Sequence, residues 1–98
     1  MRNYIISEKA ITDLEDIWLY TVEKWSAEQA DRYYNLLIDE IEFIAEDYER
    51  GREANHIKSG YWTSKVKSHI IFYNTLDDYT VKIIRILHER MDLENRLK

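Results

Sequence analysis

Arg85, His88 and Arg90 stand close together near the C-terminus, in the segment HIIFYNTLDDYTVKIIRILHERMD that begins at His69. Basic groups beside a histidine could stabilise the charged transition state of RNA cleavage and move a proton. Arginine and aromatic side chains could equally anchor a protein interface, because they bury large areas and keep directional hydrogen bonds. The cluster therefore points either to an RNA-cleaving site or to a surface that grips another protein.

Arg85 falls on a predicted strand over 79–87 that is apolar on both sides, as expected for an interior strand of a sheet. Strict alternation puts Val81, Ile83, Arg85 and Leu87 on one side and Ile84 and Ile86 on the other. The guanidinium must then leave the core or meet a carboxylate or carbonyl partner. The pattern favours a tethering role for Arg85, and a structural role is also favoured for His69.

Metal-binding and phosphate-binding motifs are not indicated by the remaining residues. His56, His69 and His88 lack the paired spacing of a zinc site, and the chain has no cysteine to complete one. Two isolated glycines, Gly51 and Gly60, do not form a phosphate-binding loop. We therefore expect no metal and no other cofactor.

The elements that must position the C-terminal cluster begin with a β-type run over 4–7, in which Ser7 is a helix N-cap. Apolar residues then recur every three or four positions up to Trp25, which predicts a helix. Ser26 and Gln29 form a capping-box pattern that opens a second helix over 27–50. Because almost no loop separates them, the two helices should form an antiparallel hairpin.

Past Gly51 the apolar period changes to two, which predicts strands over 60–66, 68–74 and 79–87. Leu76, Asp77 and Asp78 are expected in the last turn, and the segment DLENRLK could add a short C-terminal helix. We therefore predict a single domain over 1–98 of the α+β class, in the order β-α-α-β-β-β. An N-terminal strand and the antiparallel helical hairpin would pack on a small, mostly antiparallel sheet.

Both helices carry more apolar residues than one buried face requires. Leu19 and Tyr20 fall outside the apolar arc of the first helix, and Leu36 and Phe43 lie together outside that of the second. Contiguous apolar surface on a small domain indicates a partner, whereas scattered apolar residues are ordinary. Both interpretations of the hairpin stay open at this point.

The charge distribution, the lack of cysteine and the length of the apolar runs limit the classes of function that fit this chain. Residues 1–51 carry 5 Lys or Arg against 13 Asp or Glu, whereas residues 52–98 carry 9 against 6. The acidic half disfavours general nucleic-acid binding, since attraction to phosphates scales with clustered positive charge. The chain shows no cysteine, no N-terminal apolar segment and no apolar run near the roughly 18 residues of a membrane span. We expect a soluble, cytoplasmic protein without a membrane partner.

The element order and several local patterns together resemble the ParE-type toxins of the RelE/ParE superfamily. The patterns are YIISEKAITDLEDIWLY, WSAEQADRY at the helix junction, and SHIIFY followed by VKIIRILHERMD. In the most specific of them, the ending RILHxRMD, the matching residues are Arg85, Ile86, Leu87, His88, Arg90, Met91 and Asp92. The resemblance covers nearly the whole chain.

This resemblance implies the toxin half of a bacterial type II toxin–antitoxin pair, which traps DNA gyrase on cleaved DNA without enzymatic activity of its own. A ParD-like antitoxin would neutralise it in a hetero-oligomer. RelE-type relatives instead cleave mRNA on the ribosome, and Lys65, Arg85 and His88 are the catalytic candidates for that alternative. The acidic charge favours the ParE-type function. A toxin-like remnant that only binds its antitoxin is a third possibility.

Two sets of binding residues follow as expectations from the resemblance, and no sequence-specific nucleic-acid binding is expected of the toxin alone. The gyrase-binding candidates are Trp62, Lys65, Arg85, His88, Arg90 and Met91. The antitoxin-binding candidates are Trp18, Leu19, Tyr20, Trp25, Leu36 and Phe43, on the helical hairpin. An amphipathic helix of the antitoxin would lie in an apolar groove there.

Overall fold

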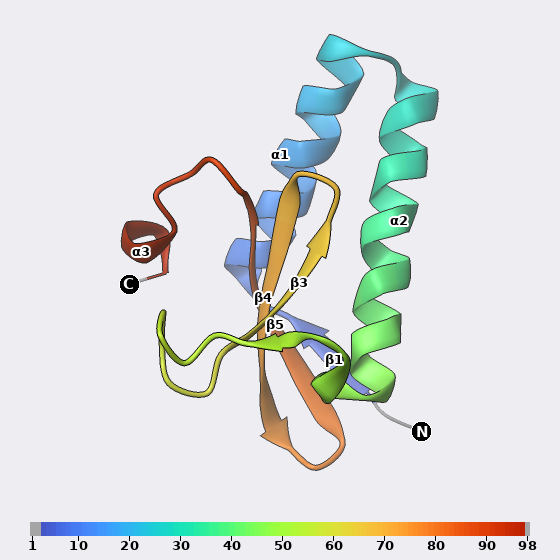
Figure 1. Cartoon of the computed structure of the whole chain (residues 1–98). Helices are drawn as coiled ribbons and strands as arrows, with labels where there is room; N and C mark the ends of the chain where they lie inside the picture. The colour runs from blue at the N-terminus through green and yellow to red at the C-terminus, as the bar shows by residue number, and fades with distance from the viewer. Residues whose placement is uncertain (1–2, 98) are drawn as a thin grey trace.

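A computed structural model describes residues 3–97, in which a helical hairpin covers one face of a five-stranded sheet (Figure 1). The strands are β1 (Asn3–Ile6), β2 (Arg52–Glu53), β3 (Trp62–Val66), β4 (His69–Asp77) and β5 (Thr80–His88), arranged in the order β1-β5-β4-β3-β2. The helices are α1 (Glu8–Lys24), α2 (Ala27–Glu46) and α3 (Leu93–Arg96), and a 3₁₀ turn spans Tyr48–Arg50. Strand β1 pairs with β5 in parallel, and the other neighbouring strands are antiparallel.

The predicted α+β class and the order β-α-α-β-β-β are confirmed, and the structure adds β2 and the 3₁₀ turn. The short C-terminal helix also forms. The ends of the predicted domain over 1–98 and the last residue of DLENRLK lie outside the described residues.

Both predicted helix caps are confirmed. The hydroxyl oxygens of Ser7 and Ser26 each accept a hydrogen bond from the backbone N–H three residues later, at 3.0 and 3.1 Å. Helix α2 ends at Glu46 rather than continuing over 27–50 as predicted. Asp47 leaves the helical conformation, with φ −154° and ψ 102°, and its side chain caps the 3₁₀ turn instead.

Strand β5 lies between β1 and β4, which confirms the interior position predicted for it. Strand β3 starts at Trp62 rather than at residue 60. Strand β4 extends to Asp77, so the predicted turn was misplaced, and the connection to β5 consists of Asp78 and Tyr79. A two-residue connection allows the antiparallel ladder to continue further than the residue pattern suggested.

A β-bulge in β5 changes which side chains face the helices. The register with β4 shifts at Ile84, so this residue is inserted between Ile83 and Arg85. Ile83 and Ile86 both pack in the core under the helices, whereas Leu87 packs on the other face of the sheet. The predicted common side for Ile83, Arg85 and Leu87 is therefore wrong, because strict alternation does not survive an inserted residue.

The sheet is covered on both faces. Helix α1 contributes Leu14 and helix α2 contributes Leu37 and Ile41 to the core on one face. On the other face, the segment over 52–61 and the C-terminal end pack against the sheet (Figure 1). The residues in this second cluster are Ala54, Tyr61, Phe72, Leu87 and Leu97. Docking of the C-terminal end fixes the course of the chain after β5.

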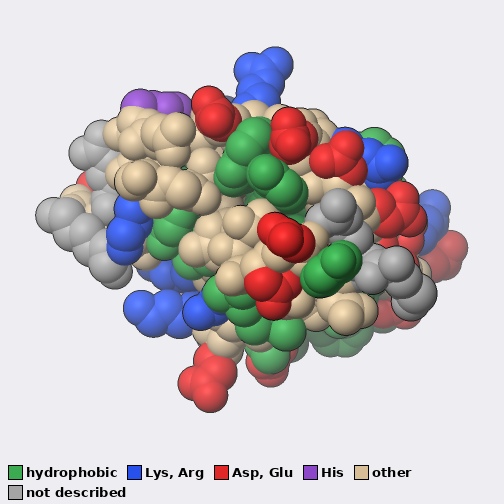
Figure 2. Space-filling model, turned by 90° about the horizontal axis from the view of Figure 1, so that it is seen from below, with side chains coloured by type: hydrophobic (Ala, Val, Ile, Leu, Met, Phe, Trp, Pro, Cys, Tyr) green, Lys and Arg blue, Asp and Glu red, His purple; other side chains and the backbone are tan. Residues whose placement is uncertain are grey.

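The helical hairpin exposes the surplus apolar residues that the sequence predicted. Leu19, Tyr20, Leu36 and Phe43 are 54, 60, 43 and 49% exposed. Trp25 is 71% exposed, because the tip of the hairpin extends beyond the β3–β4 turn (Figure 1). At the opposite end, around the β4–β5 turn, acidic side chains lie among hydrophobic ones (Figure 2).

Candidate functional site

The start of β4 and the end of β5 bring His69 and His88 together at one end of the sheet. The two residues are paired in register, and their rings meet edge to face with centroids 5.3 Å apart. The Tyr33 hydroxyl lies 2.6 Å from Nδ1 of His69 and donates to the carbonyl of Val66 at 3.0 Å. On the other side, Nδ1 of His88 accepts the backbone N–H of Arg90 at 3.1 Å. A continuous set of contacts thus joins α2 to the chain after β5.

Burial governs the protonation of this cluster. Burial, together with the neighbouring charge of His88, lowers the pKa of His69 from 6.5 to about 4, against smaller opposing contributions from Asp13 and Glu89. Burial also raises the pKa of Tyr33 to about 12. His69 is therefore neutral near pH 7 and a weak base, which supports the structural role favoured for it.

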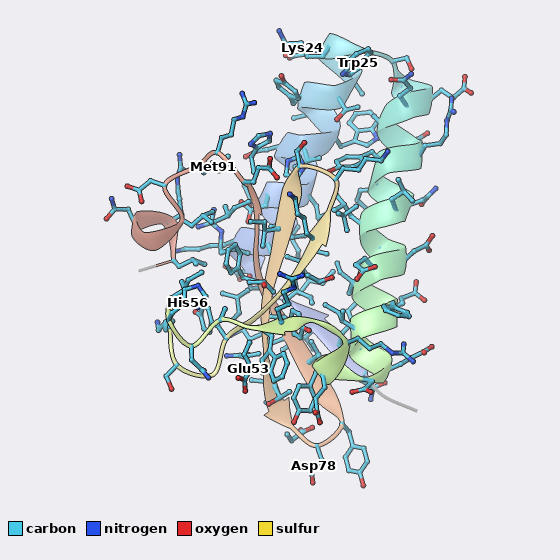
Figure 3. The ribbon with its side chains drawn as sticks, in the orientation of Figure 1. Lys24, Trp25, Glu53, His56, Asp78 and Met91 are labelled. Atoms are coloured by element: carbon cyan, nitrogen blue, oxygen red, sulfur yellow. The ribbon has the colours of Figure 1, made fainter. Side chains whose placement is uncertain are left out.

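A hollow of 840 Å³ lies between α1 and the chain that follows β5. Its walls include Ile17, Tyr20, His69, Arg85, Ile86, Leu87, His88, Met91 and Arg96. Met91 is 41% exposed and sits on the bend between β5 and α3 (Figure 3). Arg90 beside it is also exposed. An exposed methionine that lines a partly apolar hollow, with an exposed arginine next to it in the chain, forms a surface suited to a protein partner.

Arg85 makes the tethering contact that its chemistry predicted. Its Nε and Nη2 donate to the two carboxylate oxygens of Asp13 at 2.8 and 2.9 Å. Its Nη1 donates to the backbone carbonyl of Arg96 at 3.0 Å. The hydrogen bond to Asp13 raises the pKa of the guanidinium further. Arg85 therefore reaches an acidic partner on α1 and the C-terminal end of α3 at once.

Lys65 on β3 is also paired with a carboxylate. Its Nζ lies 2.7 Å from the Glu89 side chain, and the two side chains are 60 and 38% exposed. The hydrogen bond to Lys65, followed by its charge, lowers the pKa of Glu89. The backbone N–H of Glu89 donates to the carbonyl of Ser68 at 2.8 Å, which ties the chain after β5 to the β3–β4 turn. Lys65 is thus part of the same end of the sheet.

The structure brings five of the six gyrase-binding candidates to this end of the molecule, and Trp62 is the exception. Lys65, Arg85, His88, Arg90 and Met91 lie at the end of the sheet or on the chain that leaves it. Trp62 starts β3, pairs with Tyr73 and packs edge to face on Tyr48 with ring centroids 5.2 Å apart. The predicted grouping of Trp62 with the other candidates does not form, because it lies at the opposite end of β3.

A second hollow of 620 Å³, here called the inner cradle, lies between the tip of the hairpin and the β3–β4 turn. It is lined by Tyr20, Thr21, Trp25, Gln29, Arg32, Tyr33, Leu36, Lys67, Ser68, His69 and His88. Trp25 projects at the hairpin tip (Figure 3). The inner cradle unites three of the predicted antitoxin-binding residues: Tyr20, Trp25 and Leu36.

A third hollow of 370 Å³, here called the outer groove, runs between α1 and α2. It is lined by Leu14, Glu15, Trp18, Leu19, Asp31 and Tyr34. The indole Nε1 of Trp18 donates to Asp31 at 2.9 Å, which holds the ring across the two helices. Trp18 and Leu19 therefore belong to a different surface from Tyr20, Trp25 and Leu36.

Phe43, the last antitoxin-binding candidate, lines none of these three hollows. The guanidinium of Arg50 lies 4.1 Å from the centroid of its ring and donates to the Phe43 carbonyl at 2.8 Å. Phe43 is half exposed, and its ring makes a cation–π contact with Arg50. Phe43 thus lies apart from the inner cradle that Leu36 lines.

Asp13, the partner of Arg85, is the main residue of this site that the sequence analysis did not predict. It is one of the few acidic residues on the apolar side of a helix, flanked by Ala10, Leu14 and Ile17, which pack on the core. A carboxylate at a buried helix position and an arginine on a buried strand each need a partner. The sequence could have indicated the pairing of Asp13 with Arg85, because both residues need a partner of opposite charge. Nothing in the sequence indicated the contact of Tyr33 with His69.

Residues 3–97 contain neither a metal-binding cluster nor a membrane-spanning helix. No group of three or more His, Cys, Asp or Glu side chains in that range is arranged to hold a metal ion. No helix in the described part of the chain combines the length and the apolar character needed to cross a membrane.

The family model described as ParE toxin of the type II toxin–antitoxin system parDE matches residues 4–93. The chain belongs to this family.

Particular relatives agree with this assignment. Toxin ParE1 of Caulobacter vibrioides is 37% identical over 97 residues and covers 99% of both chains. Toxin ParE1 of Mycobacterium tuberculosis strain H37Rv is 34% identical over 94 residues, or 96% of both chains. Toxin ParE of Escherichia coli is 30% identical over 97 residues, covering 99% of this chain and 94% of its own.

A solved structure, the chromosomal ParDE TA system from P. aeruginosa, has the same fold. The superposition gives a TM-score of 0.76 over 90% of this chain and 95% of that chain, at 17% sequence identity. The similarity in architecture thus extends well beyond the similarity in sequence.

Proposed function

We propose that this chain inhibits DNA gyrase by binding it and holding it on cleaved DNA, and that a ParD-like antitoxin neutralises it in a cytoplasmic hetero-oligomer. The observation that carries the proposal is the exposed bend with Arg90 and Met91 beside the 840 Å³ hollow, in a chain of the ParE toxin family. His88 joins this bend to the sheet through its hydrogen bond with the Arg90 N–H. These three residues form the centre of the proposed gyrase-binding surface, with Lys65 and Arg85 beside them.

The geometry gives little support to a catalytic role for the ribonuclease candidates. Arg85 directs three nitrogens at Asp13 and at the Arg96 carbonyl, and Lys65 pairs with Glu89. Cationic side chains already paired with carboxylates offer less positive charge to the transition state of phosphodiester cleavage. Binding without covalent chemistry is therefore the better account of this surface.

Charge supports the same choice. The formal net charge is −5. An enzyme acting among ribosomal RNA phosphates gains much of its affinity from clustered Lys and Arg, and that gain is lost on an acidic protein. A protein target with basic or mixed surface presents no such difficulty.

The antitoxin would occupy the hairpin, where the inner cradle and the outer groove offer apolar surface on both sides of the helix pair. Tyr20, Trp25 and Leu36 in the cradle are large, apolar and exposed. Amphipathic helices commonly bind such grooves through apolar side chains spaced three or four residues apart. Trp18 and Leu19 in the outer groove extend the contact to the other side.

The proposal is tested by following plasmid supercoiling and cleavage by gyrase with the purified protein, with and without its antitoxin. We expect cleaved plasmid to accumulate and to disappear when antitoxin is added. Cleavage of ribosome-bound mRNA without any effect on gyrase would reject the proposal in favour of the ribonuclease. The absence of both effects, together with normal growth on expression, would favour a remnant that only binds antitoxin.

A matched pair of arginine variants links the assay to the surface. Arg90→Ala should raise the concentration needed for half-maximal cleavage about tenfold, because arginine is a frequent anchor of protein interfaces. Arg52→Ala removes another exposed arginine, on β2, and should leave this concentration unchanged. Equal potency of both variants would remove Arg90 from the proposed surface.

A further inference from the structure

Asp13 is the one charged side chain that is buried in the part of the chain the structure describes, with 9% of the residue exposed. Its Oδ2 accepts hydrogen bonds from the Arg85 Nε at 2.8 Å and from the backbone N–H of Ile86 at 2.9 Å. Its Oδ1 accepts from the Arg85 Nη2 at 2.9 Å. A buried carboxylate with three donors is well satisfied, so its position is fixed within narrow limits.

The carboxylate replaces a strand at the edge of β5. Strand β1 ends at Ile6, so the parallel ladder along β5 stops at Ile83. The next two contacts come from Ser7, whose N–H donates to the Ile83 carbonyl and whose hydroxyl donates to the Ile84 carbonyl. Asp13 then takes the Ile86 N–H, which would otherwise be a buried donor without a partner. The first turns of α1 therefore complete the sheet edge beyond β1.

Arg85 links the fixed carboxylate of Asp13 to the C-terminal end of α3. While two of its nitrogens hold Asp13, Nη1 donates to the carbonyl of Arg96, the last residue of α3. Leu97, the residue that follows α3, is 7% exposed and packs with Leu87 in the second apolar cluster. Leu93, the first residue of α3, packs against the same cluster, so the helix is held by one polar contact and by apolar contacts at both of its ends.

The chain between these anchors carries the proposed gyrase-binding surface. At its start, the N–H groups of Glu89 and Arg90 donate to Ser68 and His88. At its end, α3 is held by Arg85. Residues 89–92 therefore form a short bridge between two fixed points, and the orientation of Arg90 depends on both.

We infer that Asp13 and Arg85 are positioning residues, which set the orientation of the bridge over 89–92 and through it the strength of target binding. Neither residue needs to touch the target: Asp13 is buried and Arg85 is engaged inside the protein. The inference rests on the proposed function for the identity of the target and on the structure for the connection. It assigns Arg85 a different role from Arg90, its neighbour among the gyrase-binding candidates.

The test compares Arg85→Gln and Arg85→Lys with Arg52→Gln as a control for loss of a surface arginine. Three quantities are measured on each full-length variant: amide hydrogen exchange in α3, the concentration for half-maximal gyrase cleavage, and antitoxin affinity. For Arg85→Gln we expect α3 exchange about tenfold faster, half-maximal cleavage at about tenfold higher concentration, and antitoxin affinity within about twofold of the original. Arg85→Lys keeps the charge and should recover part of both losses.

Leu97→Ser provides a second route to the same displacement. It weakens the apolar docking of α3 and leaves Asp13 and Arg85 in place, and Leu97 lies outside the proposed binding surface. If position is what matters, Leu97→Ser should reduce gyrase cleavage in proportion to the increase in α3 exchange. A variant that loosens α3 without reducing cleavage would overturn the inference.

Two further outcomes separate this inference from the proposed function. Lost potency of Arg85→Gln with unchanged α3 exchange would show that Arg85 contacts the target directly, which contradicts a positioning role. If the unmodified protein does not affect gyrase at all, the proposed function fails. Growth arrest on expression then replaces the gyrase assay as the measure of potency, and the same relation to α3 exchange decides the inference.

Discussion

The hairpin and the C-terminal end of the sheet carry the two proposed binding surfaces, and different interactions hold each of them in place. The inner cradle is lined by large apolar side chains carried on two capped helices, with Trp25 and Leu36 exposed to solvent. The C-terminal end is held by polar contacts between distant parts of the chain, such as Asp13 with Arg85. An apolar surface tolerates small displacements, whereas a hydrogen-bonded one depends on the position of each atom. The two surfaces should therefore respond differently to substitution.

The two surfaces also share a wall. Tyr20, His69 and His88 line both the inner cradle and the 840 Å³ hollow under the C-terminal bend. A partner that fills the cradle therefore reaches the side chains that border the proposed gyrase-binding surface. Substitutions away from this shared wall are the ones that can separate the two activities.

The largest effect, a loss of folding stability, is expected from Asp13→Ala, which removes the acceptor at the centre of the polar contacts. The change leaves the largely buried Arg85 guanidinium with only the Arg96 carbonyl as acceptor, and it leaves the Ile86 N–H without one. Removing one partner of a buried ion pair costs about 3–5 kcal/mol, so the free energy of unfolding should fall by that amount. Urea denaturation measures it, and Asp16→Ala, an exposed position on the same helix, is the control. A loss below about 1 kcal/mol would show that the network contributes little.

A smaller effect, on binding rather than folding, is expected from Leu36→Asp in the inner cradle. A charge placed in an apolar contact should weaken antitoxin binding by about 2 kcal/mol, or about thirtyfold, while gyrase cleavage persists. Phe43→Asp is the matched control on the same helix, since Phe43 lies outside the cradle beneath Arg50. Titration calorimetry compares them. Equal weakening by both variants would place the antitoxin along the whole of α2.

His69, which lines both hollows, should make the stability of the fold depend on pH. The folded state lowers the pKa of His69 to about 4 from the ordinary value of 6.5. Between these values the unfolded chain binds the proton more tightly, so the free energy of unfolding should decrease as the pH falls from 6.5 towards 4. Allowing for partial solvent contact, the decrease should be about 2 kcal/mol. His69→Gln removes this contribution, and an unchanged pH profile in the variant would contradict it.

The smallest effect is expected from Lys65→Ala. The ion pair with Glu89 is largely exposed, at 60 and 38% of the two side chains. Such pairs contribute less than about 1 kcal/mol, so the free energy of unfolding should change by about 0.5 kcal/mol or less. Denaturation in low and high salt measures it. A larger loss would mean that Lys65 helps to hold the chain after β5.

Local signals predicted much of the fold. The N-caps at Ser7 and Ser26 and the change of apolar period after Gly51 gave the elements and their order. The bulge at Ile84 could not be predicted from the sequence. A periodicity argument assumes an uninterrupted strand, and the inserted residue does not change the apolar pattern in a recognisable way. The short strand β2 consists of two residues, which is too few to show any period.

The candidate surfaces were predictable in part. The chemistry of a buried arginine called for a carboxylate, yet its identity as Asp13 depends on a contact between residues 72 positions apart. Tyr20 and Leu36 were found as surplus apolar residues and Trp25 as an antitoxin-binding candidate. Their union in one cradle, and the separation of Phe43 from it, depend on where the hairpin meets the β3–β4 turn. Trp62 was grouped wrongly for the same reason, because its place along β3 decides its neighbours.

The most direct test of the two-surface account is to measure gyrase cleavage and antitoxin affinity side by side for Leu36→Asp and Met91→Ala. Leu36 belongs to the inner cradle and Met91 to the C-terminal bend. We predict that Leu36→Asp keeps gyrase cleavage and loses most antitoxin affinity, and that Met91→Ala keeps antitoxin affinity and loses potency against gyrase. If both variants lose both activities to the same extent while remaining folded, the two surfaces are one, and the account is contradicted.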